Sequence, residues 1–340
     1  MNNSLKEKSD RSIFKHKAVK ITAIVLAVLF VLAGSGIIAI YAFLGRINHA
    51  TAEQDSEFID PGVELVEEAE AIPAGYEVVD ENEFEIETVE ESVPVITDKK
   101  ITNVLLIGSD SRGDGAKGRS DTMIIFSIDK RNGKLKMTSL LRDLYVPIPG
   151  RKDNRINAAY AYGGTSLLIN TIETNFKIKI DKYVRVSFKD FVKIIDHMGG
   201  VSVNLTEKEA AIVGGSAGTR LLNGTEALRY SRIRKIDSDF GRTNRQRTVI
   251  KALIGKMKKM SITELSSLMY DIMPYITTDY SSTELLALIS QANTLKQYPL
   301  SELHIPESGK YRGVYIGGKA VLSTNLNDAA KSIQKFIYEK

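Results

Sequence analysis

The chain of 340 residues contains no cysteine. This absence excludes disulfide bonds, thiolate catalysis and zinc sites built on cysteine. Stability must therefore come from a hydrophobic core. Residues 99–340 are numerous enough to bury such a core without covalent cross-links, either as one large domain or as two small ones.

Histidine is scarce, and its four copies are His16, His49, His197 and His304. The first two precede the expected folded domain. A Ser-His-Asp arrangement therefore has little support. Any proton transfer carried out by this chain is expected to fall to a carboxylate.

Positive charge is missing from residues 47–98, which contain no Lys or Arg and carry sixteen acidic residues between Glu53 and Glu91. Mutual repulsion and interrupting prolines predict an extended acidic stalk over residues 45–98. A strand near residues 84–87 is the alternative. Seven of the 46 basic residues and nineteen of the 42 acidic residues precede residue 99, so the remainder carries a formal charge of +16. Such a charge favours a polyanionic partner.

One long run, residues 21–44, lacks any charged side chain. At about 1.5 Å per residue it is long enough to cross a bilayer core of about 30 Å. Six Lys and Arg residues precede it and only Arg46 follows closely, which predicts a cytoplasmic tail over residues 1–20 and a domain outside the cell. A cleaved signal peptide is the alternative. The expected location is the cell membrane, single-pass, and there a phosphate-bearing polymer or lipid, not nucleic acid, is the expected polyanion.

The pattern of residues 99–340 predicts a mixed α/β domain, with a central sheet flanked by helices. Buried strands are expected at 101–107, 122–128, 134–140, 183–186 and 201–204. Helices are expected at 165–176, 187–198, from about 241 to 257, and at 262–269, 283–295 and 326–338. No internal repeat is present.

Two aspartates, Asp110 and Asp121, stand at the ends of the loop that joins the first two strands. If the strands are neighbours, both carboxylates return to one rim of the sheet, where hard oxygen ligands suit Mg²⁺ beside a phosphate. Aspartates that merely hold a tight turn are the alternative. Arg119 lies in the same loop, and Arg142-Asp143 follows the third strand, either as functional groups at the rim or as an internal ion pair.

Residues 230–246 concentrate arginine. Arg232 and Arg234 project to one side of an extended segment, and the helical spacing of Arg242, Arg245 and Gln246 places them on one face of a helix. Guanidinium groups match phosphate oxygens, and a helix N-terminus adds free N–H groups. This segment predicts an anion site, with a solvated charged helix as the alternative.

Several motifs together resemble the LytR-CpsA-Psr family. The motifs are Gly108-Ser109-Asp110-Ser111-Arg112, Arg119-Ser120-Asp121-Thr122, Leu141-Arg142-Asp143, Arg155-Ile156-Asn157-Ala158-Ala159-Tyr160, Gly163-Gly164, Ala227-Leu228-Arg229-Tyr230-Ser231-Arg232-Ile233-Arg234 and Asp239-Phe240-Gly241-Arg242-Thr243-Asn244-Arg245-Gln246. They occur in the family's order over about residues 100–255, after an anchor of the same kind. Two departures are Ser139-Leu140-Leu141 in place of the family's usual Ser-Ile-Pro, and Arg155 in place of a common lysine.

The resemblance implies a phosphotransferase of the cell envelope. Such an enzyme moves a glycopolymer from an undecaprenyl-pyrophosphate carrier to peptidoglycan and forms a phosphodiester with a muramic acid hydroxyl. The polyprenyl tail then needs an apolar channel, for which helices 167–176 and 188–198 are candidates, although such side chains are more often ordinary core. A hydrolase of the same lipid pyrophosphate and a non-catalytic receptor or regulator for anionic wall polymers are the alternatives.

The resemblance also assigns roles to residues. It makes Asp110 and Asp121 the carboxylates of a Mg²⁺ site, with Mn²⁺ as a second candidate ion. Asp143 would orient Arg142 or take part in proton transfer. The pyrophosphate-binding set that it implies is Arg119, Arg142, Arg232, Arg234, Arg242 and Gln246.

Overall fold

A computed structural model describes residues 45, 48–56, 70–110, 118–233, 236–237 and 239–339. The chain divides into two units, Met1–Ile47 and Asn48–Lys340, and every element below belongs to the second. The expected cytoplasmic tail (1–20) and transmembrane helix (21–44) lie outside the described residues. Within the part that is described, no helix is both long enough and apolar enough to span a bilayer.

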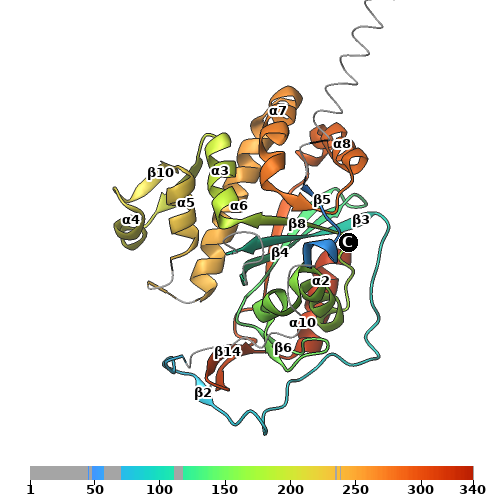
Figure 1. The fold of residues 1–340 in the computed structure, drawn as a ribbon, viewed down its shortest axis with the longest axis vertical. Helices are drawn as coiled ribbons and strands as arrows, with labels where there is room; N and C mark the ends of the chain where they lie inside the picture. Colours follow the sequence, from blue (N-terminus) through green and yellow to red (C-terminus); the bar gives the residue numbers. More distant parts are fainter. Residues whose placement is uncertain are drawn as a thin grey trace, which may run out of the picture. The chain divides into compact units, whose positions relative to one another are not determined.

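The centre of the domain is a mixed seven-stranded sheet in the order β1-β11-β8-β3-β4-β5-β12 (Figure 1). Its strands are β1 (Asn48–His49), β3 (Ile101–Ser109), β4 (Ser120–Asp129), β5 (Lys134–Leu140), β8 (Lys182–Ser187), β11 (Thr277–Thr278) and β12 (Leu300–Ile305). Strands β3, β5, β8 and β12 run in one direction, and β4 runs antiparallel between β3 and β5. The carboxyl ends of these four strands and the amino end of β4 therefore share one rim.

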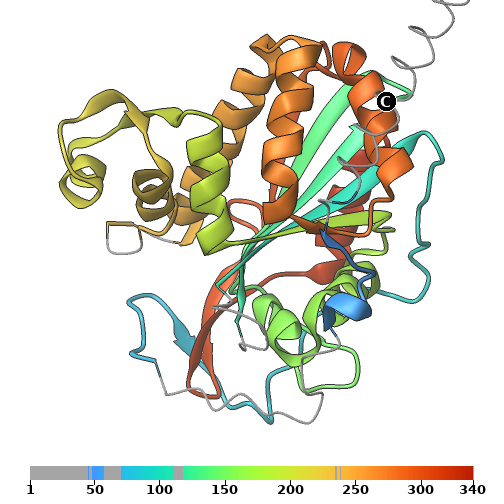
Figure 2. The ribbon, with the colours of Figure 1, turned by 45° about the horizontal axis from the view of Figure 1, so that its top comes forward.

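Helices cover both faces of the sheet, which explains why its central strands β3 and β4 are buried along most of their length. Helices α2 (Ile156–Phe176) and α10 (Leu326–Tyr338) lie on one face, and α6 (Asp239–Lys259) and α7 (Ile262–Ile272) lie on the other (Figures 1 and 2). On the first face, Leu105 and Ile125 pack with Phe176 of α2 and Ile333 of α10, all fully buried. This core fixes the rim on which the polar groups stand.

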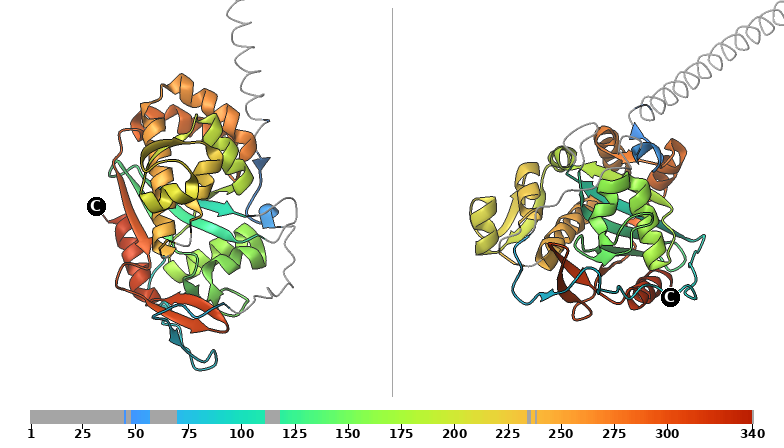
Figure 3. Two further views of the ribbon diagram at one scale, coloured as in Figure 1. Left: turned by 90° about the vertical axis from the view of Figure 1, so that its left-hand side faces the viewer. Right: turned by 60° about the horizontal axis from the view of Figure 1, so that its bottom comes forward.

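A smaller lobe packs beside α6. It contains α3 (Phe188–His197), the antiparallel pair β9 (Val201–Leu205) and β10 (Gly218–Leu222), α4 (Glu207–Val213) and α5 (Gly224–Ser231). Figure 3 shows this lobe, with β9 to α5 in yellow, at one side of the sheet. Val203, Leu222 and Tyr230 form its core together with Val249 of α6. The lobe therefore holds the first half of α6 in place.

The acidic segment differs from the free stalk expected over residues 45–98. Strand β2 (Glu77–Val78) pairs with β13 (Arg312–Ile316), which also pairs with β14 (Lys319–Ser323). Ile86 and Val89 pack against the main core, and the Gln334 side chain donates to the Pro94 carbonyl at 2.9 Å. Nearer the N-terminal end of the segment, both carboxylate oxygens of Asp55 accept hydrogen bonds from Nε of Arg185. Because apolar and charged side chains of the segment find partners on the domain, its described parts lie against the domain rather than away from it.

The predicted strands and helices are confirmed with changes at their ends. The remaining elements are β6 (Tyr145–Val146), β7 (Asn154–Arg155), the short 3-10 helices η1 (Gln54–Ser56) and η2 (Met273–Tyr275), α8 (Ser282–Ser290) and α9 (Ala292–Leu295). The helix expected at 283–295 is thus divided in two. The helix expected at 165–176 begins earlier, at Ile156, and non-helical dihedral angles at Gly163 and Gly164 introduce a kink just before Thr165.

Candidate active site

The two strand ends predicted to meet do meet. Asp110 directly follows β3, and its backbone N–H donates to the Arg119 carbonyl at 3.3 Å. In the ladder, Ser109 faces Ser120 and Gly108 faces Thr122, so Asp121 is an extra residue of β4 without an opposite partner. Such a β-bulge re-aims a side chain, and bulges are frequent beside active sites. Asp110 and Asp121 therefore stand on neighbouring strands at one rim.

Arg142 reaches the same rim from the end of β5. Its Nη1 donates to Oδ1 of Asp121 at 2.9 Å. Gln246 of α6 contacts the backbone of the same bulge, because its Nε2 lies 3.4 Å from the Asp121 carbonyl oxygen. Three segments far apart in the sequence are thus joined at Asp121.

Two further carboxylates surround the Arg142 guanidinium. Its Nε lies 3.3 Å from Oδ1 of Asp143 and 3.6 Å from Oδ1 of Asp239. Burial alone would lower the pKa of Arg142, but Asp143, Asp121 and Asp239 outweigh burial and raise that pKa. Arg142 is therefore held charged among three carboxylates.

Arg242 completes this cluster from the first turn of α6, where its side chain pairs with Asp239. Burial first, and then the negative charge of Asp143, raises the pKa of Asp239 to about 6. Burial likewise lowers the pKa of Arg242, and the nearby Arg142 adds to that effect. Asp239 is a site residue to which the sequence analysis gave no role. The sequence did contain a signal for this contact, because a residue three positions before Arg242 in the same helix lies next to it on the helix surface.

Several atoms of this cluster are buried without a hydrogen-bond partner among the described residues. They are Nε of Arg142, Oδ1 of Asp143, Oδ2 of Asp239, Nε of Arg242 and both side-chain polar atoms of Asn157. Buried polar atoms in proteins are nearly always hydrogen-bonded. A group of them at one place is expected where a polar ligand supplies the missing partners.

The acidic segment brings two residues to the site that the sequence analysis missed. Glu70 Oε1 accepts from Nη1 of Arg155 at 2.7 Å, and the same Nη1 lies 3.8 Å from Oδ1 of Asp143. Burial would raise the pKa of Glu70, but the hydrogen bond and charge of Arg155 lower it. Burial, together with the charges of Asp143 and Asp239, raises the pKa of Tyr76. No local pattern distinguishes Glu70 from the other acids of its segment.

The predicted arginine set is only partly assembled. Arg245 turns away from the rim, because it forms a forked pair with Asp237 at 2.7 Å and donates to the Ile233 carbonyl. Its role is to hold the segment before α6, so the expected shared anion face over Arg242, Arg245 and Gln246 does not include it. Arg232 is exposed and lies over the Phe188 ring at 4.7 Å. Arg234 lies outside the described residues.

The donor set fits a hydrated Mg²⁺ shared with a ligand rather than a metal site made wholly of protein. Among the described residues, no three His, Cys, Asp or Glu side chains form a group able to hold a metal. Mg²⁺ commonly takes one or two carboxylates and fills its shell with water and phosphate oxygens. Asp110 and Asp121 are two such carboxylates, although Oδ1 of Asp110 also accepts the Arg119 N–H at 2.7 Å, as in the turn-holding alternative.

The helix proposed for one wall of a lipid channel is ordinary core in its second half. Leu168, Ile172 and Phe176 are fully buried in the main cluster beside α10. The other candidate helix differs. Around α3, half-buried apolar side chains such as Val186, Leu253 and Met257 surround the buried Ile194. An apolar surface thus lies between α3, α6 and α7.

Comparison with known proteins identifies the family. The chain is 39% identical over 205 residues to the polyisoprenyl-teichoic acid–peptidoglycan teichoic acid transferase TagU of Oceanobacillus iheyensis, which covers 57% of this chain and 63% of that protein. The chain therefore spans less than two thirds of that relative's length.

Two solved structures are similar to the domain. The crystal structure of TagV from B. subtilis is 32% identical, with a TM-score of 0.59 over 71% of this chain and 98% of that one. TagT bound to LI-WTA is 26% identical, with a TM-score of 0.60 over 74% of this chain and 95% of that one. Together with a family model that matches residues 69–335, these likenesses show that the chain belongs to the LytR_cpsA_psr family.

Proposed function

We propose that this protein transfers a glycopolymer from an undecaprenyl-pyrophosphate carrier to peptidoglycan and forms a phosphodiester link. The observation that carries the proposal is the pair Arg142 and Arg242 at the sheet rim. Their side chains are only 18% and 4% exposed, and Nε of each has no hydrogen-bond partner among the described residues. The name of TagU and the LI-WTA ligand of the TagT structure support a teichoic acid as the polymer. Capsule or another wall glycan has the same linkage chemistry.

The chemistry is a phosphoryl transfer carried out by positioning and charge neutralisation. Arg142 and Arg242 bind the pyrophosphate, with Arg119, Arg232, Arg234 and Gln246 as further contacts. The oxygen of a sugar hydroxyl forms a bond to the glycan-linked phosphorus, the bridging P–O bond breaks, and the lipid phosphate leaves.

The hydroxyl proton passes to a carboxylate at the rim. Asp239 is best suited, because a proton acceptor works well when its pKa lies near the working pH, and burial has raised this pKa to about 6. Asp143, whose Oδ1 lies 3.3 Å from Nε of Arg142, orients that guanidinium.

The charge balance of the cluster supports a divalent cation. Arg142, Arg155 and Arg242 stand among four carboxylates, those of Glu70, Asp121, Asp143 and Asp239. Arginines so neutralised leave little net attraction for a pyrophosphate. Asp110 and Asp121 would hold Mg²⁺, or Mn²⁺, which when bound neutralises phosphate charge as the bridge breaks.

The lipid tail is assigned to the apolar surface between α3, α6 and α7. Half-buried apolar side chains, several of them methionines, surround its four buried ones, so apolar area remains accessible there. Residues 21–44 are assigned to a membrane anchor, with residues 1–20 in the cytoplasm and the domain outside. The domain then meets its lipid-linked substrate and peptidoglycan on the same side of the plasma membrane, and nucleic acid is not a partner.

Acceptor dependence tests the activity. The full chain, in membranes, would be incubated with the lipid-linked glycopolymer and peptidoglycan strands, and the products analysed by mass spectrometry. A product that contains both glycan and peptidoglycan is expected. Free glycan phosphate, formed whether or not peptidoglycan is present, would show a hydrolase, and binding without any product would show a receptor.

Protease added to wall-stripped intact cells tests the location. The domain should be digested while a cytoplasmic marker protein is protected. Protection of the domain would reverse the orientation, and a mature chain that starts near residue 43 would show signal-peptide cleavage.

A further inference from the structure

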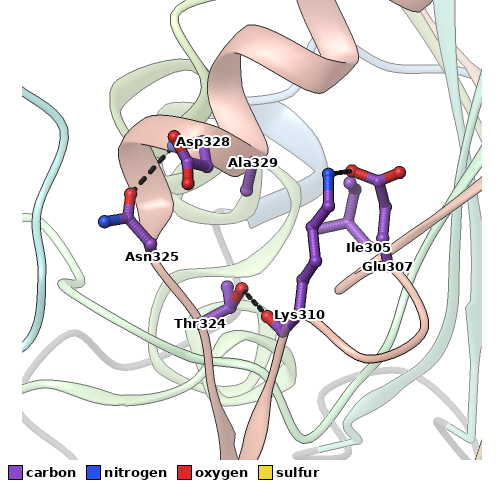
Figure 4. Close-up of a pocket in the computed structure, with 7 residues that line it drawn as sticks. All are labelled: Ile305, Glu307, Lys310, Thr324, Asn325, Asp328 and Ala329. Carbon is purple, nitrogen blue, oxygen red and sulfur yellow. Dashed lines mark hydrogen bonds and ion pairs between the residues drawn. The ribbon is translucent and has the colours of Figure 1, made fainter.

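Two cavities are lined in part by residues 304–311, which comprise the end of β12 and its connection to β13. The smaller, of about 220 Å³, is lined in part by Glu307, Lys310 and Asn325. Its polar groups are already paired, because Lys310 contacts Glu307 at 2.8 Å and Asn325 accepts the Asp328 N–H (Figure 4). The larger cavity, of about 420 Å³, is lined by Leu141, Phe240, Asn244, Arg247, His304 and Tyr311, among others.

An aromatic wall forms one side of the larger cavity. The rings of Phe240 and Tyr311 are 4.8 Å apart between centroids and inclined by 32°, and His304 meets Phe240 edge-on at 5.5 Å. The Tyr311 side chain is nevertheless 39% exposed. An exposed ring face with a negative quadrupole suits the polarised C–H groups on one face of a pyranose.

Hydrogen-bonding groups also line this cavity. Nδ1 of His304 lies 2.8 Å from the Pro306 carbonyl oxygen, which can only accept, so Nδ1 is the donor and, in that tautomer, Nε2 is an acceptor. Nε of Arg247 is buried and lies 3.7 Å from Oε2 of Glu302, and Nη2 of Arg247 donates to Oδ1 of Asn244 at 3.3 Å. The Asn244 side chain is exposed beside it, so its amide N–H groups remain accessible as donors. The cavity thus offers donors and an acceptor next to an aromatic face, the combination that fits a neutral, hydroxyl-rich ring.

The cavity adjoins the charge cluster. Leu141 precedes Arg142, and Phe240 lies between Asp239 and Arg242 in the first turn of α6. A sugar held on the aromatic wall therefore lies next to the residues assigned to the pyrophosphate.

We propose that this cavity is a subsite for one neutral pyranose unit, stacked on Tyr311 and hydrogen-bonded by Asn244, Arg247 and His304. The inference rests on the proposed function, which supplies two sources of such a sugar, the peptidoglycan acceptor and the glycopolymer donor. The site selects the glycan, while the arginine cluster binds the phosphates.

The test compares Tyr311→Ala and Asn244→Ala with Tyr270→Ala, a matched control whose tyrosine is 37% exposed on α7, away from the cavity. The full chain is titrated with a soluble peptidoglycan strand, and KM is measured for the strand and for the lipid-linked glycopolymer. The two cavity variants should weaken strand binding or raise one KM about five- to tenfold, as expected for loss of an aromatic contact or a hydrogen bond, while Tyr270→Ala should not.

A raised KM for the strand assigns the sugar to the acceptor, and a raised KM for the lipid-linked polymer assigns it to the donor. Two folded cavity variants that match the control in every constant would overturn the subsite. If the wild type forms no transfer product, the proposed function fails, and direct binding titrations with the strand and with the lipid-linked glycopolymer still test the subsite. Tyr311→Ala should weaken the binding of one of them, and unchanged binding of both would overturn the subsite.

Discussion

Asp121 is the extra residue of a β-bulge in β4, and its Oδ1 accepts a hydrogen bond from Nη1 of Arg142 at 2.9 Å. In a regular strand, side chains alternate between the two faces, and the bulge interrupts that alternation at the rim. The bulge therefore joins the loop after β3 to the end of β5 and lets the backbone of Asp121 meet Gln246 of α6.

We expect the two rim aspartates to act through one metal. Asp110→Ala and Asp121→Ala should each reduce transfer about a hundredfold, because each removes charge stabilisation that matters most as the P–O–P bridge breaks. Binding of the lipid should change much less. Transfer would be measured against Mg²⁺ concentration in both variants and in the double variant. Additive losses, or full activity in EDTA, would contradict a shared metal and leave Asp110 as a residue that holds the Arg119 turn.

Arg242 should contribute to lipid-pyrophosphate binding through its charge and also through the two parallel hydrogen bonds that a planar guanidinium can form. Arg242→Ala should weaken binding about tenfold or more, since a hydrogen bond to a charged group is worth roughly 1.5–3 kcal/mol. Arg242→Lys should retain only part of the affinity that Arg242→Ala loses, because lysine keeps the charge but lacks the planar guanidinium fork. Fluorescence titration with a labelled polyprenyl pyrophosphate measures the effect. Arg220→Ala, in the lobe and paired with Glu226, is the control; equal affinities in all folded variants would remove Arg242 from the site.

Asp239 should make stability depend on pH. Its raised pKa means that the folded chain still holds a proton between about pH 4 and 6, where the unfolded chain has released it, so a rise in pH through this window destabilises the fold. Burial and the charges of Asp143 and Asp121 raise this pKa, and the charges of Arg242 and Arg142 lower it. Relative to Asp239→Asn, the wild type should lose about 2 kcal/mol of unfolding free energy from pH 4 to pH 7.

Urea titrations of both chains at a series of pH values measure that difference. A constant difference would show that Asp239 is ionised throughout the range. A difference that grows in favour of the wild type as pH rises would show that Arg142 and Arg242 lower the Asp239 pKa instead.

Gly164 should tolerate no side chain. Its φ is +61°, and a Cβ there would come within 3 Å of Ser56, whose Oγ accepts the Ser166 N–H of α2 at 3.0 Å. Gly164→Ala should therefore destabilise the domain by about 1–3 kcal/mol. Gly255→Ala is the control, because a Cβ at that α6 position meets nothing within 4 Å and should stabilise the helix by about 0.5–1 kcal/mol. Thermal unfolding measures both, and equal midpoints would contradict the close packing of Ser56.

The sequence by itself determined the elements of this domain and much of its chemistry. Apolar runs such as residues 101–107 specify buried strands because they leave no polar face, and the helical spacing of Arg242 and Gln246 places both on one face of α6. Asp110 and Asp121 meet at one rim because the short loop between them joins two antiparallel strands that are neighbours both in the sequence and in the sheet. The motifs of these segments also sufficed to identify the family.

Only the tertiary structure decided which charges meet. Arg242 and Arg245 look equivalent in the sequence, yet one pairs with Asp239 at the rim and the other forks onto Asp237. Glu70 belongs to a segment whose acids appear interchangeable, but it alone of them bonds Arg155 among the described residues. Ion pairing and burial depend on contacts between segments far apart in the chain, and local periodicity contains no information about such contacts.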